Sequence, residues 1–217
     1  MLVKKVSFAR DTLLDPGAAP WKQAAMEIVA LKGTPLALQP SPYIKAAWKG
    51  REIGKIKSVR VQALHNGEEI FFHLEWADAT ADAKIGNDNA FPDGAALLFP
   101  MSGDAPLQTM GSKTQPVNAW QWRADFGEQG KNNVAEGLGT TRVTAVSHIT
   151  CRGSWRSGAW LLVIARPLAV PDQATEAVQF RPAAATKIAI AIWEGSNGER
   201  AGVKAFSQAW RVLQLQA

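Results

Sequence analysis

Apolar and polar residues alternate with a period of two along much of this 217-residue chain. The alternation is clearest in residues 57–64 and 68–76, and His65, Asn66 and Gly67 between them suit a tight hairpin turn. Further strand-like runs cover residues 26–31, 94–101, 117–124, 142–153, 159–167, 187–195 and 204–215. Turn-forming residues separate these runs, so the pattern predicts an all-β fold, an antiparallel β-sandwich with a few short helices in loops.

The run at 187–195 could also be a buried helix by its composition. Ile188, Ile190 and Ile192 are β-branched and recur at period two, which favours a strand. Only residues 11–15 and the polar stretch 78–90 are expected to form short helices or loops. No segment has the composition of a linker between two cores, so we expect a single domain spanning residues 1–217.

Composition narrows the function classes. Nine tryptophans against one tyrosine are an unusual excess of large flat side chains, which either fill a core or line a ligand pocket. The net charge of +5 comes without an arginine-rich arm or an aromatic RNA-binding signature, which argues against nucleic acid as a partner. Because no apolar run reaches the ~20 residues that cross a bilayer, no membrane insertion is expected. If the protein is exported, either its signal peptide is absent from this sequence or its export depends on a partner.

Catalytic groups are scarce. His65, His73 and His148 have no metal-ligand spacing, and a structural role is expected for each. Cys151 is the only cysteine, which excludes an intrachain disulfide and the two-cysteine attachment of a c-type haem. The surroundings of Cys151 fit a strand residue better than a nucleophile, so we predict no catalytic residue and no stand-alone enzyme.

Two side chains that could bind iron lie among glycines and tryptophans. Met110 precedes Gly111 in a polar loop, where it could either fill a gap in a core or present its thioether to a metal. Lysines such as Lys204 usually keep the ammonium group in water. The residues alone leave both roles open.

The segments around these two residues nevertheless match a known pattern. The first contains the apolar-Phe-Pro step 98–100, then Met110-Gly111, the Pro-Val-Asn run 116–118 and a Trp-x-Trp strand at 120–122. The second contains Trp193, Glu194, the Gly-Ser-Asn-Gly-Glu-Arg run 195–200 and Lys204. Together they resemble the haem-binding gamma subunits of periplasmic molybdenum enzymes, the family of ethylbenzene dehydrogenase, dimethylsulfide dehydrogenase, selenate reductase and chlorate reductase.

The resemblance implies one non-covalent haem b with Met110 and Lys204 as its axial iron ligands. Met101, which follows the Phe-Pro step, is a second candidate for the thioether ligand. The implied cofactor-binding set also contains Gly111, Trp120, Trp122, Trp193, Asn197 and Gly198. Candidate partners for the haem propionates are Lys113, Arg123 and Arg200.

The resemblance further implies a periplasmic electron-transfer subunit. It would connect the iron–sulfur beta subunit of a heterotrimeric molybdenum oxidoreductase, whose alpha subunit carries molybdopterin, to a soluble cytochrome or similar carrier. An oxyanion reductase such as chlorate or selenate reductase is the preferred complex. The alternative is a carbohydrate- or ligand-binding β-sandwich module without a redox role, in which exposed tryptophans would contact the ligand.

Overall fold

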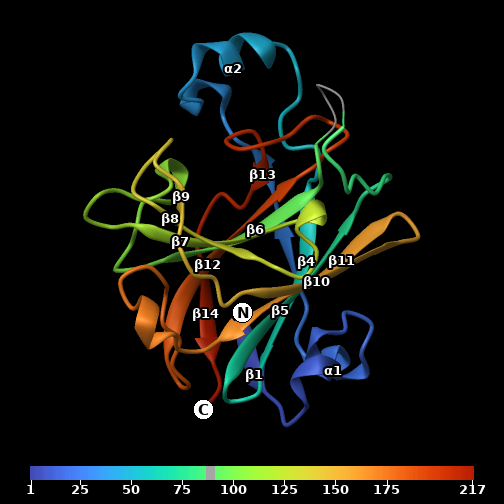
Figure 1. Cartoon of the computed structure of the whole chain (residues 1–217), viewed down its shortest axis with the longest axis vertical. Helices are drawn as coiled ribbons and strands as arrows, with labels where there is room; N and C mark the ends of the chain where they lie inside the picture. The colour runs from blue at the N-terminus through green and yellow to red at the C-terminus, as the bar shows by residue number, and fades with distance from the viewer. Residues whose placement is uncertain (87–90) are drawn as a thin grey trace.

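The computed structural model describes residues 1–86 and 91–217, in which fourteen β-strands form two sheets packed face to face (Figure 1). The first sheet runs in the order β10 (Thr150–Arg156), β11 (Ala159–Pro167), β5 (Glu69–Ala77) and β4 (Ser58–His65), with β2 (Glu27–Ala30) also on β4. The second runs β14 (Arg211–Leu215), β12 (Ala185–Trp193), β6 (Gly94–Pro100), β7 (Val117–Arg123), β8 (Lys131–Ala135) and β9 (Arg142–Val143). On the side of β12 away from β6, β13 (Ala205–Phe206) pairs with β12 and with β3 (Lys32–Gly33).

The N-terminal strand β1 (Leu2–Lys5) joins the two sheets. It pairs in parallel with β14 through Leu2 and Gln214, and with β4 through Lys4 and Leu64. The other strand pairings of the described residues are antiparallel. The all-β sandwich is therefore confirmed, and these two parallel pairings are its departure from the predicted antiparallel arrangement.

The space between the sheets is filled by the larger residues of each alternating strand. Ile188, Ile190 and Ile192 of β12 point into it and are fully buried. Trp76 and Trp160 stack there with ring centroids 6.3 Å apart, and further tryptophans from β7 pack beside them. Much of the tryptophan excess therefore stabilises the core, where these rings remove large apolar areas from water.

Each sheet also buries part of its outer face. On the first sheet, α1 (Arg10–Leu14) and η1 (Ala19–Gln23) place Leu13, Leu14 and Trp21 against Phe71 and Val163. The outer face of the second sheet lies beneath η2 (Leu36–Leu38) and α2 (Pro42–Ala47), which form the protruding segment above β13 in Figure 1. The loop with η3 (Leu107–Thr109) covers the same face from the other end.

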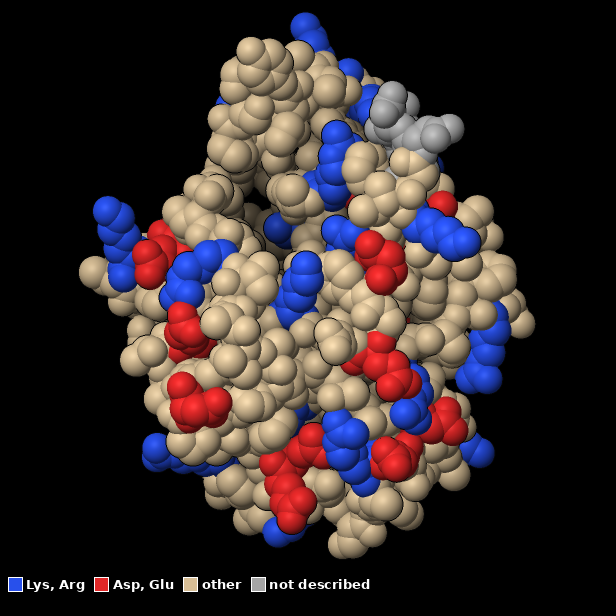
Figure 2. All heavy atoms as spheres, in the orientation of Figure 1, with Lys and Arg blue, Asp and Glu red and all other residues tan. Residues whose placement is uncertain are grey.

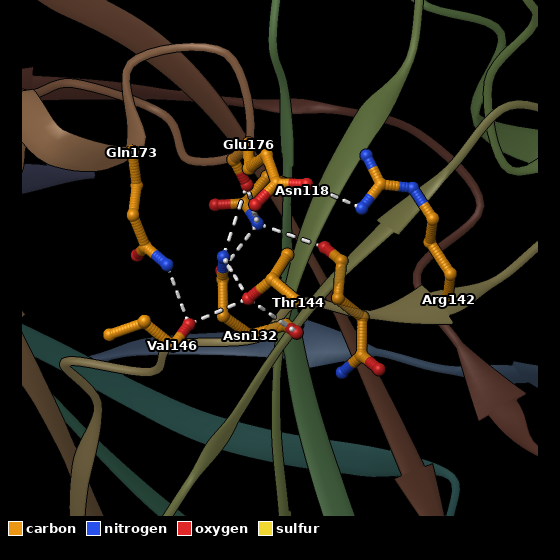
Figure 3. Close-up of polar contacts among 8 residues, drawn as sticks. Asn118, Asn132, Arg142, Thr144, Val146, Gln173 and Glu176 are labelled. Atoms are coloured by element: carbon orange, nitrogen blue, oxygen red, sulfur yellow. Dashed lines mark hydrogen bonds and ion pairs between the residues drawn. The ribbon is translucent and has the colours of Figure 1, made fainter.

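A polar network fastens the far edge of the second sheet (Figure 3). The buried Asn118 donates to Asn132 Oδ1 at 2.6 Å, and Asn132 donates to the backbone carbonyl of Glu176 at 3.1 Å. Arg142 pairs with the Glu176 carboxylate at 2.6 Å. Asn118 also accepts the indole N–H of Trp120 at 3.0 Å, so the Asn of the Pro-Val-Asn run orients a core tryptophan and anchors the loop that carries η5 (Pro171–Gln173).

The predicted strands correspond to observed ones with two corrections. The run 142–153 is divided into β9 and β10, because the Thr144 hydroxyl bonds to the Val146 carbonyl and the Ser147 hydroxyl to Gly130, which turns the chain away from the sheet. The run 204–215 is divided into β13 and β14. Strands β1, β3 and β8 and every described helix other than α1, including η4 (Ala124–Phe126), were not predicted.

The two segments that were predicted to be short helices or loops can also be compared with the structure. Residues 11–15 lie largely in helix α1, whereas residues 78–86 are irregular and the rest of the predicted 78–90 stretch lies outside the described residues. In the part of the chain that the structure describes, no helix is both long and apolar enough to span a membrane.

Candidate functional site

A cavity of about 370 Å³ lies on the outer face of the second sheet, beneath the segment with η2 and α2. Figure 2 shows the corresponding hollow below the protruding segment, and atoms of Lys or Arg residues, coloured blue, are visible inside it. Residues of β6, β7, β8 and β12 form its floor, and segments 34–44, 107–110, 138–141 and 201–204 form its walls.

The floor is flat because small side chains alternate with large ones. In β12, Ala189 and Ala191 face the cavity while the isoleucines between them face the core. Ala191 pairs with Ala96 of β6, and Ala119 of β7 continues the surface. A methyl side chain projects little from a strand, so this part of the sheet leaves room for a flat apolar molecule.

Lys204 enters the cavity from the edge of the sheet beside β12. Its backbone immediately precedes β13, and its carbonyl accepts the Thr34 N–H at 2.9 Å. The Thr34 hydroxyl donates to the Gly202 carbonyl at 2.7 Å, and Gln39 donates to the same carbonyl at 2.9 Å. A Cβ at position 202 would lie only 2.4 Å from Gln39 Oε1, so a larger residue there would displace the Gln39 side chain. The bonds fix the backbone on which the lysine stands.

The amine of Lys204 is placed where the ammonium form is disfavoured. The residue is 8% exposed, and none of the ion pairs among the described residues involves it. Its Nζ lies 5.3 Å from the centroid of the Trp193 ring. Burial lowers the pKa of Lys204 to about 8. The amine therefore loses its proton more readily than a solvated lysine does, and the neutral form can donate its lone pair to a metal.

Met110 lies at the opposite end of the floor. The strand pairing places Lys204 beyond the Trp193–Gly94 end of β12 and β6, whereas the Met110 loop follows the Pro100 end of β6. Met110 is half-buried and lines the cavity. The two candidate ligands therefore approach one cavity from different ends.

The Met110 backbone is held in an uncommon conformation. Its φ is 60° and its ψ 44°, the left-handed region that few residues other than glycine adopt. Its N–H donates to Leu107 at 3.1 Å and its carbonyl accepts the Gly137 N–H at 3.1 Å. Gly111 also has a positive φ, and a Cβ there would lie 2.8 Å from Gln115 O. Such strain persists where surrounding structure maintains it and is frequent at functional sites.

Two of the predicted cofactor contacts face elsewhere. Trp120 and Trp122 project from the other face of β7 into the core, because they alternate with the cavity-facing Ala119 and Gln121. Trp193 does line the cavity, and its indole donates to Ala201 O at 3.0 Å. Met101 continues the end of β6 and is not among the cavity-lining residues.

The remaining predicted contacts, Gly111, Asn197 and Gly198, shape turns and do not line the cavity. Asn197 donates to Glu199 Oε1 at 2.9 Å, and the same oxygen accepts the Gly54 N–H at 2.8 Å. Gly198 has a φ of 76°. The Gly-Ser-Asn-Gly-Glu-Arg run is thus a tightly bonded turn that leads the chain from Trp193 to Lys204.

Basic side chains gather at a smaller hollow of about 70 Å³ that shares Gln121, Trp193 and Ala201 with the main cavity. Arg123 and Arg200 line it. Arg123 is paired with Asp125 at 2.5 Å, and the Arg200 guanidinium lies over the Phe91 ring at 4.1 Å from its centroid. Lys113 is exposed and lines neither hollow, so the structure brings together only two of the three predicted propionate partners.

Cys151 and His73, both considered in the sequence analysis, are packed in the interior and do not line the cavity. Cys151 is fully buried in the core, where burial raises the pKa of its thiol. His73 stacks on Trp21 at a centroid distance of 5.1 Å, and burial lowers its pKa to about 4.

Segment 34–44 forms one wall of the cavity through residues that include Pro35, Leu38 and Ile44, and none of these was predicted to belong to a site. The sequence signal that could have revealed the floor is the alternation of isoleucine with alanine in β12.

Solved structures show the fold that this chain adopts. A family 9 carbohydrate-binding module from Caldicellulosiruptor kristjanssonii superposes with a TM-score of 0.55 at 6% identity, over 100% of this chain and 95% of that one. A putative carbohydrate-binding protein from Bacteroides uniformis gives a TM-score of 0.53 at 12% identity, over 100% and 98% of the two chains. At these identities the similarity concerns the fold alone.

Sequence relatives are more informative. The chain is 33% identical to a putative respiratory nitrate reductase heme subunit of Haloferax mediterranei over 92% of this chain and 68% of that one. It is 30% identical to the chlorate reductase subunit gamma of Ideonella dechloratans over 99% and 84% of the two chains. It is 31% identical to the dimethylsulfide dehydrogenase subunit gamma of Rhodovulum sulfidophilum over 71% and 59%.

The profile of the ethylbenzene dehydrogenase family matches residues 18–147 and 138–205, which include the floor, the Met110 loop and Lys204. The family match spans most of the chain, and the relatives named as gamma or heme subunits extend over the same region. This chain therefore belongs to the ethylbenzene dehydrogenase family, together with these gamma and heme subunits of oxidoreductases.

Proposed function

We propose that this chain is a haem b electron-transfer subunit in which Met110 and Lys204 are the two axial iron ligands. The observation that carries the proposal is the buried Lys204 amine, which faces an apolar cavity without an ion-pair partner among the described residues. A buried lysine that needed only a structural role would be expected to have a carboxylate beside it. The family match and a relative named as a heme subunit support the cofactor.

The residues that line the cavity are suited to a haem. An alanine floor accommodates a flat macrocycle, Trp193 adds an aromatic wall, and Met110 offers a soft thioether. When bound, the haem supplies a one-electron carrier whose reduction potential depends on its axial ligands. Arg123 and Arg200, at the adjoining small hollow, are the side chains that would pair with its propionates.

Each ligand contributes through its own chemistry. Met110 is a weak donor that favours ferrous iron, because thioethers bind the softer oxidation state better. Lys204 must be neutral to bind, and burial has already lowered its pKa towards neutrality. With Met110 and Lys204 both bound, the iron would have no position left for oxygen or substrate, so the haem would carry electrons and would not transform a substrate.

The partners follow from the relatives. The gamma subunits of chlorate reductase and dimethylsulfide dehydrogenase are named as parts of larger enzymes. By analogy, this chain passes electrons between an iron–sulfur beta subunit and a soluble cytochrome in the periplasm, with a molybdopterin alpha subunit completing a heterotrimer. An oxyanion reductase such as chlorate or selenate reductase is the preferred complex.

The alternative, a carbohydrate-binding module, depends on tryptophans that present their rings to solvent. Of the nine tryptophans, seven are buried, Trp210 is half-buried and Trp155 is 36% exposed. Sugar-binding sandwiches would need an exposed aromatic platform, so this observation favours the haem subunit.

The visible spectrum of the purified protein tests the proposal. We expect a low-spin haem spectrum that resists added imidazole and carbon monoxide, and a Lys204→Gln variant that binds both. Lys32→Gln, an exposed lysine on neighbouring β3, is the matched control and should behave as the wild type. A protein that stays colourless after haem is offered would contradict the cofactor. A Lys204→Gln variant with an unchanged low-spin spectrum would contradict the lysine ligand alone.

A further inference from the structure

Three buried carboxylates meet at one end of the sandwich, outside the cavity. Asp78 follows β5, Asp93 precedes β6 and Glu194 follows β12, so the cluster joins the ends of both sheets. One carboxylate oxygen from each lies within 4.8 Å of the other two. The residues are 4%, 0% and 5% exposed, respectively.

Two of these carboxylates accept several hydrogen bonds from the surrounding backbone and from an indole. Asp93 accepts the backbone N–H of Gly195 and of Asp82, both at 2.8 Å, and the indole N–H of Trp160 at 2.9 Å. Glu194 accepts two backbone N–H groups of the turn that follows it, each at 3.0 Å. All five contacts come from N–H donors.

Asp78 provides a second, independent sign of a ligand. Its Oδ1 accepts the Thr80 N–H at 3.2 Å, but its buried Oδ2 makes no hydrogen bond of normal geometry with the described residues, although the equally unpartnered indole N–H of Trp76 lies nearby. An unpaired buried acceptor is costly, and this one belongs to a carboxylate that contacts two others.

In the described part of the chain, no Lys or Arg side chain forms an ion pair with these three carboxylates. The charges that act on Asp78 are those of Asp93 and Glu194, which are of the same sign. Buried like charges require a compensating cation, and oxygen-only ligands select a hard one.

We infer that Asp78, Asp93 and Glu194 bind a calcium ion that ties the ends of the two sheets together. The three carboxylates come from three separate segments, and such ligands suit Ca²⁺, which tolerates flexible geometry, better than Mg²⁺, which demands a near-ideal octahedron. The ion also fixes the start of the 195–200 turn, through Glu194 and the Asp93–Gly195 bond. The site is separate from the haem cavity, and the inference holds whether or not the chain binds haem.

Calcium titration of the EDTA-treated and dialysed protein tests the inference. We expect isothermal titration calorimetry to give one Ca²⁺ per chain, and the melting temperature to rise by roughly 5–10 °C at a hundredfold excess over Kd. Asp78→Asn should abolish both effects. Asp172→Asn, which removes an exposed carboxylate far along the chain, should bind Ca²⁺ as the wild type does.

If Asp78→Asn fails to fold, the wild-type titration still tests whether the protein binds Ca²⁺, and Glu194→Gln provides a second variant for testing the ligands. No uptake by the wild type at millimolar Ca²⁺ would overturn the inference, as would uptake of Zn²⁺ without Ca²⁺. Unchanged binding in both variants would overturn the assignment of the ligands. If the wild type does not bind Ca²⁺ and Asp78→Asn has a higher melting temperature than the wild type, the carboxylates share a proton and do not bind a metal.

Discussion

At the scale of single residues, the site depends on two side chains held in unfavourable states. Met110 occupies a left-handed backbone conformation, and Lys204 has its amine buried with a lowered pKa. Both states reduce stability unless something compensates, and a metal bound by both side chains would do so. The two residues therefore define the most direct experiments on this protein.

The thioether ligand can be identified by comparing two methionines. Met110→Ala should remove the soft ligand from the cavity, so the haem reduction potential should fall or the iron should become high-spin. Met101→Ala is the matched control and should leave both unchanged, because Met101 does not line the cavity. Redox titration followed by visible absorption measures the effect. If the two variants exchange their behaviour, Met101 is the ligand.

The buried amine predicts a pH effect on the protein without haem. The folded pKa of Lys204 is about 8, whereas an unfolded lysine titrates near ~10.4. Between these values the unfolded state holds the proton and the folded state does not, so stability rises with pH through this window. The unfolding free energy of the wild type, relative to Lys204→Met, should increase by roughly 2–3 kcal/mol from pH 7 to pH 10.

Urea denaturation of both proteins at the two pH values measures this difference. Lys22→Met is the control, because Lys22 is exposed and should give no pH-dependent difference. A difference between wild type and Lys204→Met that does not change with pH would mean that the amine is solvated in the free protein.

At the scale of elements, the alternation of large and small residues in β6, β7 and β12 creates two faces with different functions. The large residues pack between the sheets, and the alanines leave the cavity open. A strand with large residues on both faces would have closed the cavity.

Filling the floor should therefore block the cofactor without unfolding the sandwich. Ala96→Leu places a larger side chain at the centre of the floor, and we expect haem affinity to fall at least ~10-fold, since overpacking typically costs ~1–3 kcal/mol. Ala185→Leu, at the exposed start of β12, is the matched control. Haem titration and thermal melting measure the two effects. Unchanged affinity in Ala96→Leu would place the haem elsewhere.

At the scale of the whole molecule, the chain has one cavity of cofactor size among the described residues and no predicted catalytic residue of its own. A haem in that cavity is useful only if a donor and an acceptor approach it. The sandwich is thus expected to work as one part of a larger assembly.

Co-purification from the native host tests the assembly. We expect a stable complex with an iron–sulfur and a molybdopterin subunit, with an interface above ~1,000 Å². Substrate added to the complex should change the oxidation state of the haem, measured by its absorption bands, and complex without substrate is the control. A chain that elutes alone, and whose haem never responds to turnover, would be a free-standing haem carrier.

Most of the strands, and the family, could be predicted from local sequence patterns. Period-two alternation predicted the hairpin of β4 and β5 and the strands β6, β7, β11 and β12, because side-chain direction in a strand is a local property. The motifs around Met110 and Lys204 indicated the family that the comparisons confirm. Ligation of iron by these two residues stays a prediction.

Which face of each strand is covered, and which distant segments meet, could not be predicted in this way. Alternation separates two faces but does not say which one is covered, so Trp120 and Trp122 were predicted at the cofactor and lie in the core. The walls from segment 34–44 and the cluster of Asp78, Asp93 and Glu194 bring together residues from distant parts of the chain. Such convergence depends on how the two sheets and their covering segments pack, and local sequence patterns do not encode that packing.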